Sequence, residues 1–122
     1  MTSLNINPQR GQIWLVNFDP KVAEEIGKRR PAIVINAAGM GKLPLRIVVP
    51  ITDWKDGYSR YPWFTRLTPA PANGLSKISG ADSFQVKSLA ISRFHTQIGA
   101  LSPEQLKAVL SCLAICVDFV PS

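Results

Sequence analysis

Residues 31–35 (PAIVI) and residues 45–50 (LRIVVP) are two short apolar segments, and a loop that contains Gly39 and Gly41 separates them. Short apolar runs bounded by glycine-containing loops are typical of buried strands. The two segments therefore indicate that the chain is built on a β-sheet.

The chain on either side of these two segments is predicted to form further strands and loops. Residues 12–18 (QIWLVNF) are rich in aromatic and β-branched residues and end at Asp19-Pro20, which predicts a strand stopped by a turn. The polar residues 21–30, which include Gly27, are predicted to form a mobile loop. Further along the chain we expect a loop at residues 53–61, a strand at 63–67, a connection at 68–74 and a strand at 81–89.

The last part of the chain changes period and predicts a helix. Ser102, Pro103 and Gln105 supply an N-cap, a proline at the first helical position and the glutamine of a capping box. The apolar stripe that can cover the sheet consists of Leu106, Val109, Leu110, Leu113 and Val117. A second set on a neighbouring face consists of Ala108, Cys112, Ile115 and Phe119. We expect this second face to form a dimer interface; the alternative is a helix sunk deep in its own core.

The predicted fold class is α+β: a small, bent antiparallel β-sheet or SH3-like barrel with a C-terminal helix. At 122 residues, one hydrophobic core is enough to fold the chain, so we expect a single domain over residues 1–122.

Composition narrows the class of protein. With 46% hydrophobic and 18% charged residues, the chain is too apolar for a disordered protein and too mixed for a membrane protein. Residues 1–7 show neither the basic nor the apolar region of a secretory signal, so we expect a cytoplasmic protein. Cys112 and Cys116 lie four residues apart on the predicted helix and are interpreted as small buried hydrophobic residues rather than as a disulfide or metal pair.

Charge is concentrated in the middle of the chain. Between residues 28 and 93 there are eleven Lys or Arg residues and three Asp residues, a net charge of +8. A polyanion such as a nucleic acid is the expected partner, because neutralisation of phosphates supplies most of the affinity that is independent of base sequence. The alternative is a basic surface that only keeps the protein soluble.

The familiar hydrolase sites are missing from the sequence. His95 is the single histidine, so one chain cannot supply a two-histidine ribonuclease site, and we interpret it as a structural residue. The acidic residues are too few and too scattered for a two-metal nuclease, and no serine lies in a Gly-x-Ser-x-Gly motif.

Six segments of the chain contain recognisable motifs: residues 10–20 (RGQIWLVNFDP), 27–35 (GKRRPAIVI), 48–52 (VVPIT), 74–79 (GLSKIS), 85–89 (QVKSL) with the following Arg93-Phe94, and 98–102 (IGALS) before the helix. Each segment alone is a weak signal, but together they cover nearly the whole chain. In this order they are similar to the motifs of MazF/PemK toxins, the endoribonucleases of type II toxin–antitoxin systems.

This resemblance implies an mRNA interferase: a sequence-specific, metal-independent endoribonuclease that needs no cofactor. It cleaves single-stranded RNA through attack of the ribose 2′-hydroxyl on the adjacent phosphate, and so stops translation and growth. The catalytic residues carried over by position are Arg30 and Thr52. A guanidinium and a hydroxyl at a strand end suit this chemistry, because the scissile phosphate gathers negative charge. Arginine remains protonated, so we expect Arg30 to stabilise charge or donate a proton late rather than act as a base.

An RNA groove is expected around this pair. Its predicted RNA-binding residues are Asn17, Asp19, Lys28, Arg29, Asp53, Trp54, Ser79, Gln85 and Lys87. Other roles remain open for several groups: a loop salt bridge of Arg30 with Glu24 or Glu25, and an ordinary turn hydroxyl for Thr52. Local packing is the alternative to RNA stacking for the aromatic residues of the 53–61 loop.

The resemblance also implies partners. We expect a homodimer and a cognate acidic antitoxin, with no membrane. The antitoxin is expected to dock near residues 21–30 and 53–61 and to displace RNA, and its complex with the toxin is expected to bind operator DNA through the antitoxin. Two alternative functions are a CcdB-like gyrase poison and a non-catalytic RNA-binding relative. Asp53 and Phe84 depart from the commonest family pattern, so the RNA sequence that is cut cannot be borrowed from relatives.

Overall fold

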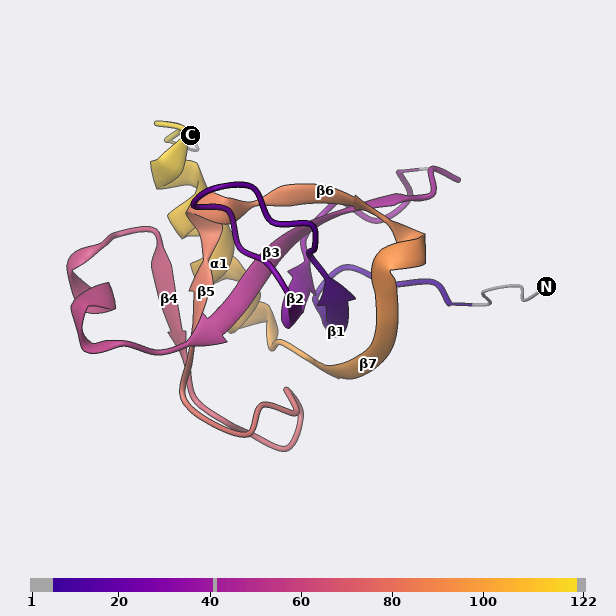
Figure 1. Ribbon diagram of the computed structural model, residues 1–122. Helices are drawn as coiled ribbons and strands as arrows, with labels where there is room; N and C mark the ends of the chain where they lie inside the picture. Colours follow the sequence, from indigo (N-terminus) through magenta and orange to yellow (C-terminus); the bar gives the residue numbers. More distant parts are fainter. Residues whose placement is uncertain (1–5, 41, 121–122) are drawn as a thin grey trace.

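The computed structural model describes residues 6–40 and 42–120. Within these residues the chain forms an antiparallel sheet followed by one α-helix (Figure 1). The strands are β1 (Gln12–Asn17), β2 (Arg29–Val34), β3 (Leu45–Asp53), β4 (Phe64–Leu67), β5 (Ser79–Asp82), β6 (Lys87–Ala90) and β7 (Phe94–Ala100). The helix is α1 (Pro103–Cys116), and short 3-10 helices form η1 (Asp56–Arg60), η2 (Ser83–Gln85) and η3 (Ile91–Arg93).

The sheet is bent around β3, its longest strand. The strand order is β4-β5-β3-β2-β1-β7, and β6 also pairs with β3. The first half of β3 pairs with β6 and its second half pairs with β5, on the side away from β2. Among the described residues the path of paired strands ends at β4 and at β7, so the sheet is open rather than closed into a barrel. The predicted α+β fold with a bent antiparallel sheet and a C-terminal helix is confirmed.

Residues on the central strands alternate between two apolar clusters, as the period of two in a strand requires. One cluster includes Ile13, Ile33, Val49 and Ile51 together with Val109 of α1, and we call this side of the sheet the helix face. The other includes Trp14, Val16, Ala32, Val34, Val48 and Phe18, with Ile26 packed against it, and we call it the loop face. Figure 1 shows α1 behind the strands and the chain between β1 and β2 crossing in front of them.

The helix begins as predicted. Ser102 accepts a hydrogen bond from the Gln105 backbone N–H at 3.1 Å, and the Gln105 side chain accepts one from the Ser102 N–H at 3.0 Å. This capping box satisfies two N–H groups that the first turn leaves without helical partners. Four of the five predicted stripe residues pack against the core; Val117 is wrong, since it lies at the end of the helix and is 65% exposed.

The second predicted helix face is only partly as expected. Ile115 and Phe119 are 55% and 62% exposed, and Ala108 is exposed too. Cys112 instead lies against β4, where its sulfur accepts a hydrogen bond from the Thr65 hydroxyl at 3.3 Å. Cys112 and Cys116 are half-buried free thiols rather than fully buried residues.

Three strand predictions need correction. The single strand expected over residues 81–89 is divided into β5 and β6 by η2, because the buried Ser83 hydroxyl turns to donate to the Val109 carbonyl of α1 at 3.2 Å. Strand β3 continues past Pro50 to Asp53. Pro50 lies where the neighbouring strand changes from β6 to β5, so its missing N–H is tolerated. Strand β7 was not predicted, because it is an edge strand whose first half carries exposed polar residues.

Candidate functional site

Arg30 and Thr52 lie side by side at one end of the loop face. In the β2–β3 ladder Ala32 is opposite Pro50, and two further steps in this register bring Arg30 opposite Thr52. Opposite residues of an antiparallel pair project from the same face, so the two side chains meet. Arg30 Nη1 donates a hydrogen bond to Thr52 Oγ1 at 3.2 Å. The structure thus brings together the two residues predicted to be catalytic.

The Arg30 guanidinium has no carboxylate partner among the described residues. Its Nε donates to the Gly27 carbonyl at 2.9 Å, and the salt bridge considered with Glu24 or Glu25 does not form. Carbonyl and hydroxyl oxygens orient the guanidinium without neutralising its charge. Since its remaining N–H groups make no hydrogen bond or ion pair within the described residues, the arrangement can bind an oxyanion.

Asn17 and Asp19, both predicted to bind RNA, shape the β1–β2 loop, residues 18–28. Asn17 Oδ1 accepts from the Asp19 N–H at 3.0 Å, and Asp19 Oδ1 accepts from the Lys28 N–H at 2.7 Å. Arg93 donates to the Asn17 carbonyl at 3.1 Å and to the Asp19 carbonyl. Hydrogen bonds thus hold this loop to the sheet at both ends. A mobile loop was expected over residues 21–30, but its last two residues, Arg29 and Arg30, belong to β2. Lys28 is the last residue of the loop and Arg29 is the first residue of β2. Both are exposed, and they directly precede Arg30.

Gln85 reaches the same loop from η2. Its Oε1 accepts from the Ile26 N–H at 2.7 Å, and its Nε2 donates to the Glu24 carbonyl at 3.1 Å. Both ends of the amide are therefore engaged with the loop. The residue was predicted to bind RNA, and in the structure its side chain joins η2 to the β1–β2 loop.

A pocket of about 210 Å³ opens beside Thr52. Ser79 lines it, is 5% exposed and donates its hydroxyl hydrogen bond to the Lys77 carbonyl at 2.8 Å. Asp53 forms an exposed ion pair with Lys77, Oδ2 to Nζ at 3.0 Å. The lining residues are Pro31, Ile51, Thr52, Asp53, Gly74, Leu75, Ser76, Lys77, Ser79 and Ile98.

The aromatic residues after β3 pack on one another. Trp54 meets Tyr58 edge to face at a centroid distance of 5.6 Å, and Tyr58 stacks on Phe64 at 3.9 Å. Trp54 also lies over Gly80, where an added Cβ would be 3.1 Å from Trp54 Cε3. Of the two roles left open for this loop, local packing is the one observed.

Lys87 is not brought to the catalytic pair. It begins β6 opposite Val48, on the loop face but four residues along β3 from Thr52. Two residues with contacts at the site were absent from the predicted set: Arg93 and Lys77, which appeared only within motifs. Their partners, Asn17, Asp19 and Asp53, are distant in sequence, so no local pattern indicates these contacts.

Asp82 ends β5, next to the turn that carries Gln85. Its carboxylate accepts from the Phe84 N–H at 3.2 Å. Burial raises the pKa of Asp82, and backbone N–H groups of Phe84 and Gln85 partly offset this rise. Burial, with Asp82 and Cys112 nearby, also raises the pKa of the Cys116 thiol, which favours its neutral form.

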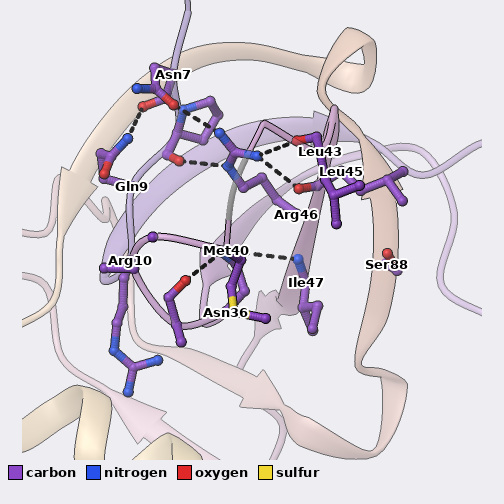
Figure 2. A pocket seen from close by; sticks show the side chains of 14 residues that line it. Asn7, Gln9, Arg10, Asn36, Met40, Leu43, Leu45, Arg46, Ile47 and Ser88 are labelled. Carbon is purple, nitrogen blue, oxygen red and sulfur yellow. Dashed lines mark hydrogen bonds between the residues drawn. The ribbon is translucent and has the colours of Figure 1, made fainter.

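A larger pocket of about 430 Å³ lies at the other end of β3 (Figure 2). Figure 2 shows Arg46 at its rim, where the guanidinium donates to Pro8 O at 2.8 Å, Leu43 O at 3.0 Å, Leu45 O at 2.8 Å and Asn7 Oδ1 at 2.8 Å. Arg46 thus joins the segment before β1 to the β2–β3 loop. At ~3.4 Å per residue, it lies roughly 20 Å along β3 from Thr52.

No group of three or more His, Cys, Asp or Glu side chains is placed to hold a metal ion in the described part of the chain. No helix within residues 6–40 and 42–120 is long and apolar enough to cross a membrane.

Comparisons with known proteins agree on one family. Residues 9–117 match the family model of PemK-like, MazF-like toxins of type II toxin–antitoxin systems. Endoribonuclease MazF9 of Mycobacterium tuberculosis is 30% identical over 116 residues, which cover 90% of this chain and 96% of the relative.

Solved structures with the same fold include MazF from Deinococcus radiodurans, with 27% identity, a TM-score of 0.77 and coverage of 94% of this chain and 100% of that one. A MazE–MazF structure from the same organism is 28% identical, with a TM-score of 0.70 and coverage of 93% and 97%.

Proposed function

Because the chain belongs to the family of PemK-like, MazF-like toxins of type II toxin–antitoxin systems, we propose that it is an endoribonuclease that cleaves single-stranded RNA at the Arg30–Thr52 pair. The observation that carries the proposal is the hydrogen bond between these two side chains, at the end of a sheet face and without a carboxylate near the guanidinium among the described residues. A cation oriented by neutral oxygens is suited to an anionic substrate.

The proposed reaction is a transesterification. The ribose 2′-oxygen forms a bond to phosphorus, the bond from phosphorus to the 5′-oxygen breaks, and the products are a 2′,3′-cyclic phosphate and a 5′-hydroxyl. The proton of the 2′-hydroxyl passes to water, and the departing 5′-oxygen takes up a proton from water. Between these events, negative charge accumulates on the non-bridging oxygens of the phosphate.

Arg30 and Thr52 would stabilise that charge. Arg30 would donate hydrogen bonds to the phosphate through the N–H groups that Gly27 and Thr52 leave free. Thr52 accepts a hydrogen bond from Arg30, so its own O–H proton remains available for a phosphate oxygen. Removal of one such donor from a preorganised site typically slows catalysis by ~10²–10³-fold.

The surroundings support an extended RNA substrate. The net charge of +8 between residues 28 and 93 favours binding of the phosphate backbone. The pocket beside Thr52 would receive the ribonucleotide next to the cleaved bond, with Lys77 at its rim. Lys28 and Arg29 would contact phosphates on the other side.

The proposal includes two protein partners. A cognate acidic antitoxin would bind across residues 18–28 and 53–61 and exclude RNA; the solved MazE–MazF pair of Deinococcus radiodurans supports an antitoxin partner. A second copy of the chain would pack on the exposed end of α1, where Ile115 and Phe119 are 55% and 62% exposed. We further propose that the protein acts in the cytoplasm and that its complex with antitoxin binds operator DNA through the antitoxin.

The test is to map the 5′ ends of RNA fragments after incubation with the purified protein in EDTA. We expect cleavage that leaves 5′-hydroxyl ends and that Arg30→Ala abolishes. Intact RNA with the wild-type protein, or cleavage that requires added divalent metal, would contradict the proposal. Inhibition of gyrase with no RNA cleavage would favour the alternative function on this fold.

A further inference from the structure

We propose that Gln85 is a positioning residue that fixes the β1–β2 loop and, through the Gly27 carbonyl, the catalytic orientation of Arg30. The proposal rests on the function proposed above. It assigns a role inside the protein to Gln85, a residue that was predicted to bind RNA.

The chain of contacts is continuous. Gln85 holds the backbone at Glu24 and Ile26, with hydrogen bonds of 3.1 and 2.7 Å. The next residue, Gly27, presents its carbonyl to Arg30 Nε at 2.9 Å. Arg30 in turn donates to Thr52 at 3.2 Å. A shift of the loop at Ile26 therefore moves the oxygen that orients the guanidinium.

The loop has little freedom to absorb such a shift at Gly27. A Cβ added there would lie 2.8 Å from Lys21 Cβ and 2.9 Å from Asp19 Oδ1, so the backbone is closely packed against the start of the same loop. Ile26 packs against the apolar cluster of the loop face. Gln85 is thus the polar contact that joins this closely packed segment to η2.

The amide of Gln85 is engaged at both ends in these contacts. Its oxygen accepts from one backbone N–H and its nitrogen donates to one backbone carbonyl. An RNA base that took over both contacts would displace the loop, and this would release the Gly27 carbonyl that holds Arg30. The Gln85 amide therefore cannot bind an RNA base with both ends and at the same time hold the loop that orients Arg30.

The variant that tests the proposal is Gln85→Met, which keeps the length of the side chain and removes both hydrogen bonds. The matched control is Gln97→Met, because Gln97 is an exposed glutamine of β7 whose amide donates to the Gly99 carbonyl at 3.3 Å. A misplacement of about 1 Å can slow an oriented reaction by up to about 10²-fold. We expect Gln85→Met to lower kcat by about 10- to 100-fold with KM changed by less than about threefold, and Gln97→Met to change neither.

Two further measurements separate positioning from RNA contact. Hydrogen exchange of the Ile26 amide, measured without RNA, should accelerate in Gln85→Met and stay unchanged in Gln97→Met. Affinity for an RNA with a 2′-deoxyribose at the cleavage site, measured in the Arg30→Ala background, should be the same with and without the Gln85→Met substitution.

Unchanged protection of Ile26, or a fall in RNA affinity with kcat preserved, would overturn the proposal. The exchange measurement needs no activity, so it also separates the two ideas: if Gln85→Met loosens the loop but the wild-type protein cuts no RNA, the loop contact stands and the catalytic role fails together with the proposed function.

Discussion

The two faces of the sheet bury similar apolar residues, but very different segments of the chain pack over them. On the helix face, α1 lies over Ile13, Ile33 and Val49 and is held mainly by apolar packing. On the loop face, residues 18–28 lie over part of a second apolar cluster and are held by polar contacts from Gln85, Arg93 and Asp19. The contacts of α1 with the sheet come from one repeating apolar pattern along the helix. The contacts of the β1–β2 loop come from individual hydrogen bonds.

This difference separates stability from chemistry. Apolar burial contributes about 25 cal/mol per Å² and needs no particular orientation, so the helix face suits the main core. Hydrogen bonds are directional and fix single groups in place. The Arg30–Thr52 pair lies on the face where such bonds dominate. We therefore expect substitutions on the two faces to affect different properties of the protein.

The largest expected effect is on the helix face. Ile33→Ala removes a fully buried side chain at 0% exposure and should lower the free energy of unfolding by about 2–5 kcal/mol. Ile33→Val, which loses one methylene group, should cost about 0.5–1.5 kcal/mol. Urea denaturation followed by tryptophan fluorescence measures both. Equal stability of Ile33→Ala and the wild-type protein would show that the helix face is not the main core.

The converse substitution is Thr52→Val on the loop face. It keeps the shape of the side chain but removes the hydroxyl that contacts Arg30, so cleavage should fall by ~10²-fold while the free energy of unfolding changes by less than about 0.5 kcal/mol. Thr52→Ser, which retains the hydroxyl, should keep most of the activity. A Thr52→Val protein that is active, or one that is unfolded, would contradict the expectation that the helix face determines stability and the loop face determines activity.

A smaller effect is expected at the start of α1. Ser102→Ala removes the acceptor of the Gln105 N–H and should lower the free energy of unfolding by about 1 kcal/mol. Ser92→Ala is the control, since Ser92 is exposed in η3. Thermal unfolding of both variants, with RNA cleavage measured in parallel, should show a loss of stability for Ser102→Ala alone and unchanged activity at low temperature in both.

The smallest effect concerns Asp82, the last residue of β5. Because burial raises the pKa of Asp82, the folded state holds its proton more tightly than the unfolded state does. Stability should therefore decrease as pH rises from the ordinary aspartate value through the raised pKa. Asp82→Asn keeps an acceptor for the Phe84 N–H and should flatten this decrease, with slightly higher stability at pH 7. Parallel stability curves of the two proteins from pH 3 to 7 would argue against the raised pKa.

The two faces also differ in how far they could be predicted. The start of α1 was predictable because Ser102, Pro103 and Gln105 form a signal within four residues. The central strands were predictable from short apolar runs. Strand β7 was not, because its exposed edge residues lack an alternating pattern, and the division of β5 from β6 depends on a hydrogen bond from Ser83 to a helix residue 26 positions away.

At the candidate site, the family resemblance identified the Arg30–Thr52 pair but not the contacts that hold the neighbouring loop in place. Arg30 and Thr52 followed from motif positions, and their contact follows from strand register. The contacts of Gln85 and Arg93 join residues 59 to 76 positions apart, so only the folded chain reveals them. The burial of Ser79 could not be predicted either, because a hydroxyl in a motif gives no sign of its own burial.

The β2–β3 register has a consequence for how such a chain tolerates length changes. Side chains alternate along a strand, so a one-residue slip moves every side chain to the other face. An inserted residue within β2 between Arg30 and Ala32 would leave the apolar residues paired as before but turn Arg30 away from Thr52. An insertion in the loop around Gly39, where an added Cβ meets nothing within 4 Å, would leave the pairing untouched. Insertions and deletions should therefore accumulate in the β2–β3 loop and be excluded from the short stretch of β2 between the site and the core.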